Sequence, residues 1–330
     1  MLLEKFKSYR KLAIASLIFN CIGLVSAYFV QYLPDDMKFV GLFVTTGIFP
    51  AIGAALIFGP SLLIIDEWVG GDHTAIANGF VTCGTSFGAI VYNQIAQRVM
   101  ELNDWWLMYL VFAGFFFVIF VFATCVFKEN KTKPNSNKQY KVVQIGNQYL
   151  DFFDWIFSIM ACSMGSTMLA YYIPPVLLPM LSTNENCSEF VLHYIMAIFG
   201  LANMAGRLLS GVFVWAIDKY SIKTSDSEET KMAKQNYSTS GVYIASLLIS
   251  SAASFVFAFT KSYGDVVFIS YTIVYGFAAG IFIALRSPVV NKMYNGDEQK
   301  SKKPFMFCLT FQGCAAILGF ILAGKSNSIP

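Results

Sequence analysis

The segment WWLMYLVFAGFFFVIFVFATCVF, residues 105–127, contains no charged side chain and is long enough to cross the hydrocarbon core of a bilayer as one α-helix. That core offers no water to backbone amides. An uninterrupted apolar run therefore favours a helix, which satisfies its own hydrogen bonds, over the alternating strands of a barrel. Further runs of similar character bring the predicted total to about nine transmembrane helices. They cover residues 12–33, 39–65, 75–97, 152–180, 190–217, 241–260, 266–290 and 305–323.

The composition of the whole chain agrees with a membrane location. Of its 330 residues, 56% are hydrophobic and 13% are charged. Soluble domains carry about a quarter of charged residues, so this chain has too few for a soluble surface of ordinary size. We therefore predict an all-α membrane protein, a multi-pass helix bundle whose immediate partner is the lipid bilayer.

Lysine and arginine residues gather in alternate loops when nine helices are threaded through the membrane. The positive-inside rule places those loops in the cytosol, so we expect the N-terminus in the cytosol and the C-terminus outside. Cys187 then lies in an outer loop. We interpret the basic clusters as solvated membrane anchors and expect no nucleic-acid partner. The clusters occupy residues 5–11, 128–141, 219–234 and 292–303.

A polar segment that begins KENKTKPNSNKQYK at residue 128 divides the apolar runs into two groups. The segment is too polar to fold alone, and we interpret residues 128–151 as a cytosolic linker. Residues 1–127 are then an N-terminal bundle of four helices, and residues 152–330 are a C-terminal bundle of five.

A weak internal repeat indicates a larger arrangement. Glycines and a proline in the run at 39–65 have counterparts at similar spacing in the run at 266–290. The two runs correspond if the protein is built from two halves of six helices, although two glycine-containing helices can also resemble one another by chance. If the repeat holds, we expect the first half to lack its first two helices and the second half to lack its last. The matched residues are Gly47, Gly53 and Pro60 in the first run and Gly276, Gly280 and Pro288 in the second.

Small residues and prolines mark special positions in the predicted helices. The GxxxG pairs Gly84 with Gly88 and Gly276 with Gly280 are predicted helix-packing positions, because they let two backbones touch. Residues 171–175, Tyr-Tyr-Ile-Pro-Pro, are predicted to interrupt the fifth run, since each proline removes a backbone donor and clashes with the preceding turn. Such a break is compatible with a transport path or with a plain helix end at the outer surface.

Arg207 lies near the middle of an apolar run, where a charge is costly and therefore marks a functional candidate. Asn203 and Gly211 share its helix face, because they are four residues away on either side. A guanidinium binds a carboxylate through two parallel hydrogen bonds, so Arg207 and Asn203 predict contact with a small organic anion. A structural ion pair between Arg207 and Asp154 or another carboxylate is the alternative.

Arg286 is the second basic residue inside a run and a further candidate for substrate contact. It lies about two turns from the cytosolic end of its run, so anchoring to lipid headgroups and a role as a cytosolic gate are alternatives. The sequence shows no Ser-His-Asp order, paired carboxylates or Gly-rich phosphate loop in a reachable arrangement, and no metal-ligand spacing. We therefore expect no enzyme activity, no cofactor and no bound metal.

Three stretches resemble the monocarboxylate transporters of the major facilitator superfamily. The most specific is GLANMAGRLLSGVFVWAID, residues 200–218. The resemblance implies twelve helices in two bundles, alternating access, and engagement of the substrate carboxylate by Arg207. It also implies a solute carrier of the plasma membrane, with a proton and an accessory membrane subunit as optional partners. The second stretch begins at Gly59-Pro60-Ser61, continues through Trp68 to Ala75-Ile76-Ala77-Asn78-Gly79, and ends with Gly84 and Gly88. The third match is the single residue Trp105.

The chain also departs from the family pattern. Asn203 stands where the family often has a proton-titrating aspartate, and Trp106 stands where an arginine is expected. The family's first two helices and its twelfth have no match, so the chain is expected to be truncated at both ends. We therefore expect a facilitative or proton-linked carrier of monocarboxylates or related small organic anions. The alternative is a non-transporting membrane protein, or an incomplete fragment, derived from a transporter scaffold.

Overall fold

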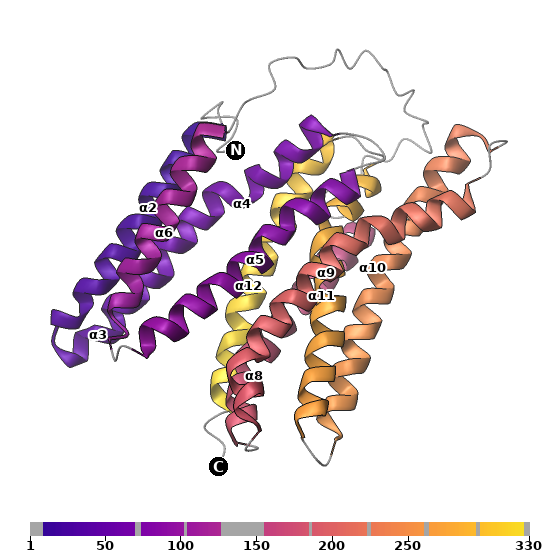
Figure 1. Cartoon of the computed structure of the whole chain (residues 1–330). Helices are drawn as coiled ribbons and strands as arrows, with labels where there is room; N and C mark the ends of the chain where they lie inside the picture. The colour runs from indigo at the N-terminus through magenta and orange to yellow at the C-terminus, as the bar shows by residue number, and fades with distance from the viewer. Residues whose placement is uncertain are drawn as a thin grey trace. The chain divides into compact units, whose positions relative to one another are not determined.

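The computed structural model describes several stretches of the chain, and every regular element in them is helical (Figure 1). The prediction of an all-α fold is therefore confirmed. The linker predicted at 128–151 lies outside the described residues. The described stretches are residues 9–69, 74–101, 104–126, 155–184, 187–222, 226–260, 264–294 and 298–326.

Within these stretches, 8 helical spans are long and apolar enough to cross a membrane. The ninth predicted run falls in α12 (Glu298–Ser326), where the apolar part found among the described residues is the shorter stretch Pro304–Leu318. The 8 spans are Tyr9–Tyr32, Asp35–Gly59, Ala75–Val99, Leu107–Cys125, Phe157–Thr183, Glu189–Ser221, Ala233–Ala258 and Asp265–Met293.

The chain divides into two compact units. Unit 1 comprises Met1–Trp68 and Val91–Ser136, and unit 2 comprises Val69–Ile90 and Asn137–Pro330. The division differs from the predicted bundles in one helix, α5 (Thr74–Met100), whose first part belongs to unit 2. The physical reason is that this part of α5 makes polar contacts with helix α9 of unit 2, which are described below.

Unit 1 is built around α2, which packs against both α4 and α6. The Ser16 hydroxyl donates to the carbonyl oxygen of Gly53 at 2.7 Å, and a Cβ on Gly53 would overlap the side chain of Asn20. The missing side chain therefore lets α2 and α4 approach closely around buried polar groups. The helices of unit 1 outside α5 are α2 (Tyr9–Phe29), η1 (Val30–Tyr32), α3 (Asp35–Leu42), η2 (Phe43–Ile48), α4 (Phe49–Trp68) and α6 (Leu107–Val126).

The second predicted run is not one regular helix, because the π-helical segment η2 separates α3 from α4. The hydroxyl groups of Thr45 and Thr46 donate to the carbonyl oxygens of Gly41 and Leu42 at 2.8 and 2.7 Å. Hydroxyl bonds of this kind compete with the regular backbone pattern and favour a locally widened or bent helix. The apolar pattern of the sequence contained no signal for this change.

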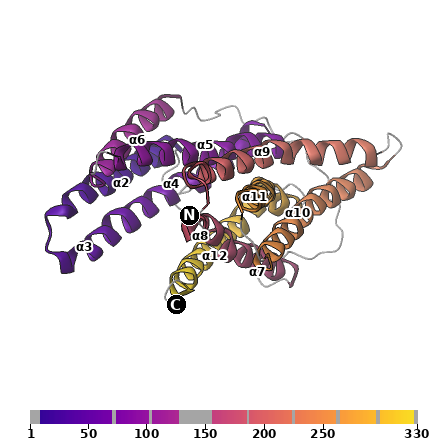
Figure 2. The same ribbon diagram turned by 60° about the horizontal axis from the view of Figure 1, so that its bottom comes forward.

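Unit 2 contains the first part of α5 and six further helices. Helix α11 packs on α9 and α10, and α7 packs on α12. Figure 2 shows α11 nearly end-on beside α10. Every residue of α11 from Ala278 to Val290 is buried, so α11 is the central helix of the unit. The further helices are α7 (Trp155–Tyr171), α8 (Ile173–Asn184), α9 (Glu189–Ser221), α10 (Glu228–Ala258), α11 (Asp265–Met293) and α12.

The predicted interruption of the fifth run is confirmed. Helix α7 ends at Tyr171 and α8 begins at Ile173. Pro174 and Pro175 then occupy the first turn of α8, where backbone N–H groups have no partner within the helix and a proline costs little. The break leaves Tyr171 buried at the end of α7, with 9% of its surface exposed.

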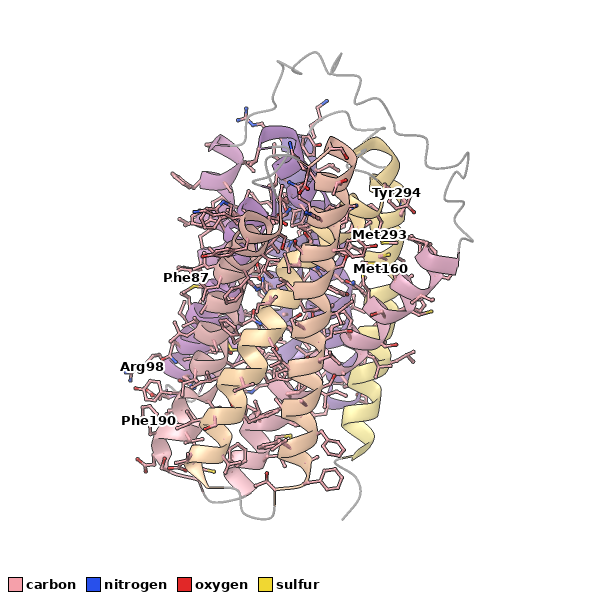
Figure 3. The ribbon with its side chains drawn as sticks, turned by 90° about the vertical axis from the view of Figure 1, so that its right-hand side faces the viewer. Phe87, Arg98, Met160, Phe190, Met293 and Tyr294 are labelled. Carbon is pink, nitrogen blue, oxygen red and sulfur yellow. The ribbon has the colours of Figure 1, made fainter. Side chains whose placement is uncertain are left out.

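Large apolar side chains point away from the protein along many of the spans. Phe80 and Phe87 of α5 are 71% and 60% exposed, and Phe190 at the start of α9 is 56% exposed. Figure 3 shows Phe87 and Phe190 projecting from the ribbon. A soluble monomer rarely exposes so much apolar surface, so this pattern fits helices whose outer faces contact lipid.

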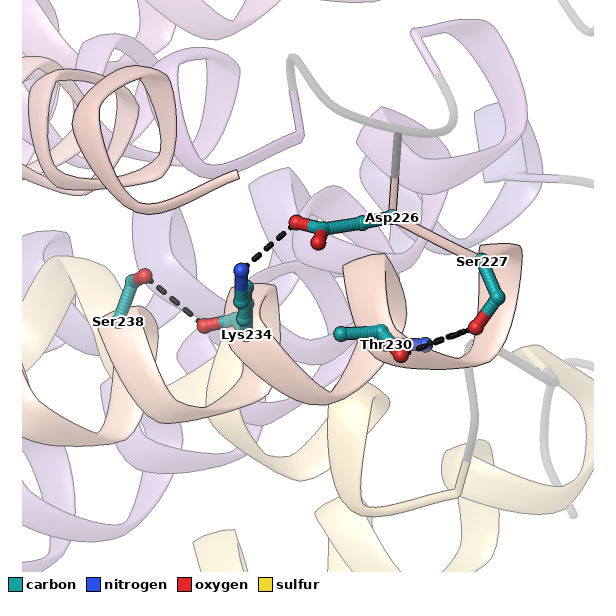
Figure 4. Close-up of polar contacts among 5 residues, drawn as sticks. All are labelled: Asp226, Ser227, Thr230, Lys234 and Ser238. Carbon is teal, nitrogen blue, oxygen red and sulfur yellow. Dashed lines mark hydrogen bonds and ion pairs between the residues drawn. The ribbon is translucent and has the colours of Figure 1, made fainter. Parts of the chain in front are cut away.

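The start of α10 is fixed by a set of polar contacts (Figure 4). The backbone N–H of Thr230 donates to the hydroxyl of Ser227, the N-cap residue, at 3.3 Å. Lys234 Nζ forms an ion pair with Asp226 at 2.7 Å, and the hydroxyl of Ser238 donates to the carbonyl oxygen of Lys234 at 2.9 Å. A shallow hollow of about 290 Å³ lies beside Lys234, between α9 and α10.

Candidate functional site

Arg207 lies in the middle of α9, and only 4% of its surface is exposed. Buried residues recur on α9 about every four positions, so one face of this helix is turned into unit 2 along much of its length. Asn203 and Gly211 are buried on the same face. The α-helical periodicity therefore places the arginine inside the protein rather than toward lipid.

The guanidinium of Arg207 is in contact with neutral groups from its own helix and from two others. Its Nε donates to the side-chain oxygen of Asn203, one turn earlier on α9, at 2.8 Å. Its Nη1 donates to the backbone carbonyl oxygen of Thr82 and to the hydroxyl of Thr85, both on α5. The ring hydroxyl of Tyr171 on α7 also interacts with the guanidinium. Three helices of unit 2 therefore meet at this one side chain.

No ion pair joins Arg207 to a carboxylate among the residues that the structure describes. Asp154, the predicted alternative partner, lies outside them. A buried guanidinium whose described partners are all neutral keeps its positive charge uncompensated within that part of the chain. An anion that reaches it would form charge-assisted hydrogen bonds in a region of low dielectric constant.

Asn203 is bound by the protein at both ends of its amide and is 2% exposed. Its oxygen accepts from the hydroxyl of Ser86 at 2.7 Å and from Arg207, and its nitrogen donates to the carbonyl oxygen of Gly276 at 3.1 Å. These partners fix the orientation of the amide, since only the oxygen can accept from two donors. Asn203 thus joins α5, α9 and α11 and orients the arginine. Its direct contact with a substrate stays a prediction.

Glycines create the space in which these helices cross. A Cβ on Gly79 of α5 would overlap the carbonyl oxygen of Arg207, and a Cβ on Gly280 of α11 would overlap that of Asn203. At Gly276 the nearest atom would be the carbonyl oxygen of Phe199, at 3.0 Å. Substitution at these positions therefore pushes the backbones apart.

The other predicted glycine pair is placed differently. No described heavy atom lies within 4 Å of the position that a Cβ on Gly84 would take. Gly88 is half-buried. The GxxxG spacing is the same in both pairs, so the spacing alone does not show which pair lies at a helix crossing. A helix-packing role for Gly84 and Gly88 stays a prediction.

Arg286 is the second buried arginine of unit 2 and is 5% exposed. Its Nη1 donates to the side-chain oxygen of Gln312 on α12 at 3.0 Å. Arg286 and Arg207 interact electrostatically with one another, and both interact with Tyr171. The guanidinium is thus directed into unit 2 and not outward along α11, which does not fit an anchor to lipid headgroups.

Sequence reasoning did not identify Thr82, Thr85, Ser86 or Gln312. A hydroxyl or an amide in an apolar run is common in membrane helices, where it usually bonds to its own backbone. Its significance appears only when a neighbouring helix brings an arginine or an asparagine to it. No group of three or more metal-ligating side chains lies together within the described stretches.

Comparison with known proteins identifies the architecture. The family model described as Major Facilitator Superfamily matches residues 1–224. The chain is 25% identical over 278 residues to the "Fujikurins efflux protein" of Gibberella fujikuroi, and the aligned region covers 84% of the chain and 52% of that protein. It is 21% identical over 206 residues to "Monocarboxylate transporter 4" of Mus musculus, and the aligned region covers 61% of the chain and 42% of that protein. The chain thus spans about half the length of the curated relatives it matches.

A solved structure of similar fold is the transporter FucP in its outward conformation. The TM-score is 0.58 at 14% sequence identity, and the similarity covers 98% of this chain and 77% of FucP. A likeness at this identity concerns the fold alone. It confirms the predicted helix bundle of the major facilitator type.

Proposed function

This chain belongs to the major facilitator superfamily, and from that premise we propose that it transports monocarboxylates or related small organic anions across a membrane by alternating access. The observation that carries the proposal is the buried Arg207 with neutral partners on α9 and α5. A charge inside the membrane costs several kcal/mol by most estimates, and such residues commonly mark a substrate pathway. The bound anion offsets that cost during transport.

The geometry of the guanidinium favours a carboxylate. Its planar N–H groups match the two oxygens of a carboxylate in parallel, charge-assisted hydrogen bonds, and a cationic or neutral substrate lacks the negative charge that strengthens them. Arg286 is proposed as a second contact, since its charge acts on the same region of unit 2. Asn203 is proposed to contribute mainly by orienting Arg207, because its amide is already bound at both ends.

The comparisons support a carrier without fixing the substrate. One relative is named as an efflux protein and another as a monocarboxylate transporter, and a further solved structure of similar fold is titled a fucose:proton symporter. We propose the anion from the arginine and from the sequence resemblance. A proton and an accessory membrane subunit are optional partners in this proposal, and the plasma membrane with a cytosolic N-terminus is the proposed setting.

Uptake measurements with Arg207 variants test the proposal. The full chain is reconstituted into liposomes, and uptake of labelled lactate, pyruvate and an aromatic carboxylate is compared with that of uncharged analogues. Replacing Arg207 by Ala removes charge-assisted bonds of about 1.5–3 kcal/mol, so uptake of the carboxylates is expected to fall roughly tenfold or more. Arg207→Lys keeps the charge but loses the two parallel bonds, so an intermediate loss is expected.

Arg98→Ala is the matched control, because the Arg98 side chain is 81% exposed and its ion pair with Glu101 is on the surface. Uptake by this variant should equal that of the wild type. Equal uptake by the Arg207 and Arg98 variants would remove Arg207 from the substrate pathway. Absence of uptake for every anion in the wild type would favour the alternative, a non-transporting protein on a transporter scaffold.

A further inference from the structure

We infer that Thr85 of α5 and the substrate carboxylate compete for the same edge of the Arg207 guanidinium, so that Thr85 sets the affinity for the anion and couples its binding to the release of α5 from α9. This inference rests on the proposed function. It adds a residue that the sequence pattern did not identify, and it connects the anion site to a helix that divides between the two units.

The competition follows from the N–H groups of the guanidinium. A carboxylate forms two parallel bonds either with Nη1 and Nη2 or with Nε and Nη2. In this structure Nη1 is bonded to Thr82 and Thr85 of α5, and Nε is bonded to Asn203. Either mode of binding therefore has to displace one partner that is already present.

The contact with α5 is the one expected to yield. Asn203 lies one turn from Arg207 on the same helix, is 2% exposed, and is bonded at both ends of its amide. Thr85 belongs to the exposed residues of α5, and its hydroxyl already donates to the carbonyl oxygen of Thr82 at 2.9 Å. If the contact between Thr85 and Arg207 is broken, the Thr85 hydroxyl therefore still has a hydrogen-bond partner. A charged oxygen is also a stronger acceptor for a guanidinium than a hydroxyl or a neutral carbonyl.

Displacement of α5 would loosen several contacts between α5 and α9 at once. Near Arg207, α5 contacts α9 through the bond from Ser86 to Asn203, through the Cys83 thiol at 3.6 Å from the carbonyl oxygen of Met204, and through the close approach at Gly79. Beyond Ile90, α5 continues into unit 1. Binding of the anion therefore weakens the attachment of α5 to unit 2, and by linkage any change that weakens this attachment raises the affinity for the anion.

Equilibrium binding tests the first half of the inference. A labelled monocarboxylate is titrated into the purified full chain in detergent or nanodiscs. Thr85→Val keeps the shape of the side chain and removes the competing hydroxyl, so a Kd about five- to tenfold lower than wild type is expected. Thr124→Val on α6 is the matched control, because its hydroxyl likewise donates to the carbonyl oxygen three residues earlier, that of Val121, at 2.8 Å, and it belongs to unit 1. Its Kd should stay within about twofold of wild type.

Thiol labelling tests the second half without any substitution. Cys83 is 8% exposed at the contact of α5 with α9. The rate of its modification by N-ethylmaleimide, followed by peptide mass spectrometry, is expected to rise several-fold when the carboxylate is added. Cys187, which lies outside this contact, serves as the reference and should not change. In the absence of the anion, Thr85→Val should show part of the same increase.

The outcomes separate the two proposals. No binding of any carboxylate by the wild type would defeat the proposed function itself. Binding by the wild type, with a Kd for Thr85→Val equal to or higher than that for Thr124→Val, would overturn the competition. An anion-independent labelling rate at Cys83 would overturn the release of α5 even if the Thr85 variant failed to fold.

Discussion

At the scale of single residues, the anion contact proposed for this protein centres on Arg207 and on the groups that hold it. The arginine is a buried cation whose described hydrogen-bond partners are an amide, a carbonyl and a hydroxyl. The amide of Asn203 is suited to its place because it offers an acceptor to Arg207 and a donor to Gly276 at the same time. An ionised carboxylate in its place could accept from Arg207 but could not donate to Gly276.

Replacing Asn203 by Asp is therefore expected to make uptake depend on pH. The ionised carboxylate would pair with Arg207 and face the carbonyl oxygen of Gly276 without a donor, so uptake of a carboxylate at neutral pH should fall severalfold. Protonation in acid restores a neutral side chain with one donor, and uptake should recover. The check is the pH profile of uptake relative to the wild type, and identical profiles would count against the orienting role of Asn203.

At the scale of helices, close crossing at glycines organises unit 2. Helix α11 is buried from Ala278 to Val290 and approaches α9 where Gly280 meets the backbone of Asn203 and Arg207. The same principle acts in unit 1, where Gly53 of α4 lies against Asn20 of α2. In both crossings the glycine lets a polar side chain on the partner helix stay buried and hydrogen-bonded.

A pair of alanine substitutions tests this packing. Gly280→Ala would place a Cβ against the carbonyl oxygen of Asn203 and should destabilise the protein by about 1–3 kcal/mol through overpacking. Gly84→Ala meets no described atom within 4 Å and should leave stability unchanged or raise it by up to about 1 kcal/mol, because alanine is the better helix former. Thermal unfolding of the two variants in detergent gives the comparison. Equal losses would mean that Gly84 also lies at a close crossing.

At the scale of the whole molecule, the distribution of charge predicts the orientation in the membrane. Lysine clusters occupy alternate loops, and Lys219 and Lys234 lie near the ends of α9 and α10 that the positive-inside rule assigns to the cytosol. Cys187 lies just before α9, at the opposite end of that helix from Lys219. The two ends of one spanning helix must face opposite sides of the membrane.

Labelling of Cys187 in intact cells tests the orientation. A membrane-impermeant maleimide is expected to modify Cys187 without permeabilisation if the N-terminus is cytosolic. The modified peptide is identified by mass spectrometry, and Cys187→Ser provides the blank. Modification of Cys187 only after permeabilisation would reverse the proposed topology and leave the fold unaffected.

The sequence by itself determined the helical membrane fold, the approximate spans, the break after Tyr171 and the presence of a costly cation at Arg207. These features depend on local length, hydropathy and proline chemistry, which act within one segment of chain. Only the tertiary structure decided which neighbours Arg207 has on α5, that Arg286 bonds to Gln312, and that Gly280 lies at a crossing while no described heavy atom lies within 4 Å of a Cβ on Gly84. Helices that are apolar on every side reveal little about their rotation or partners, so these contacts are fixed only when the helices pack.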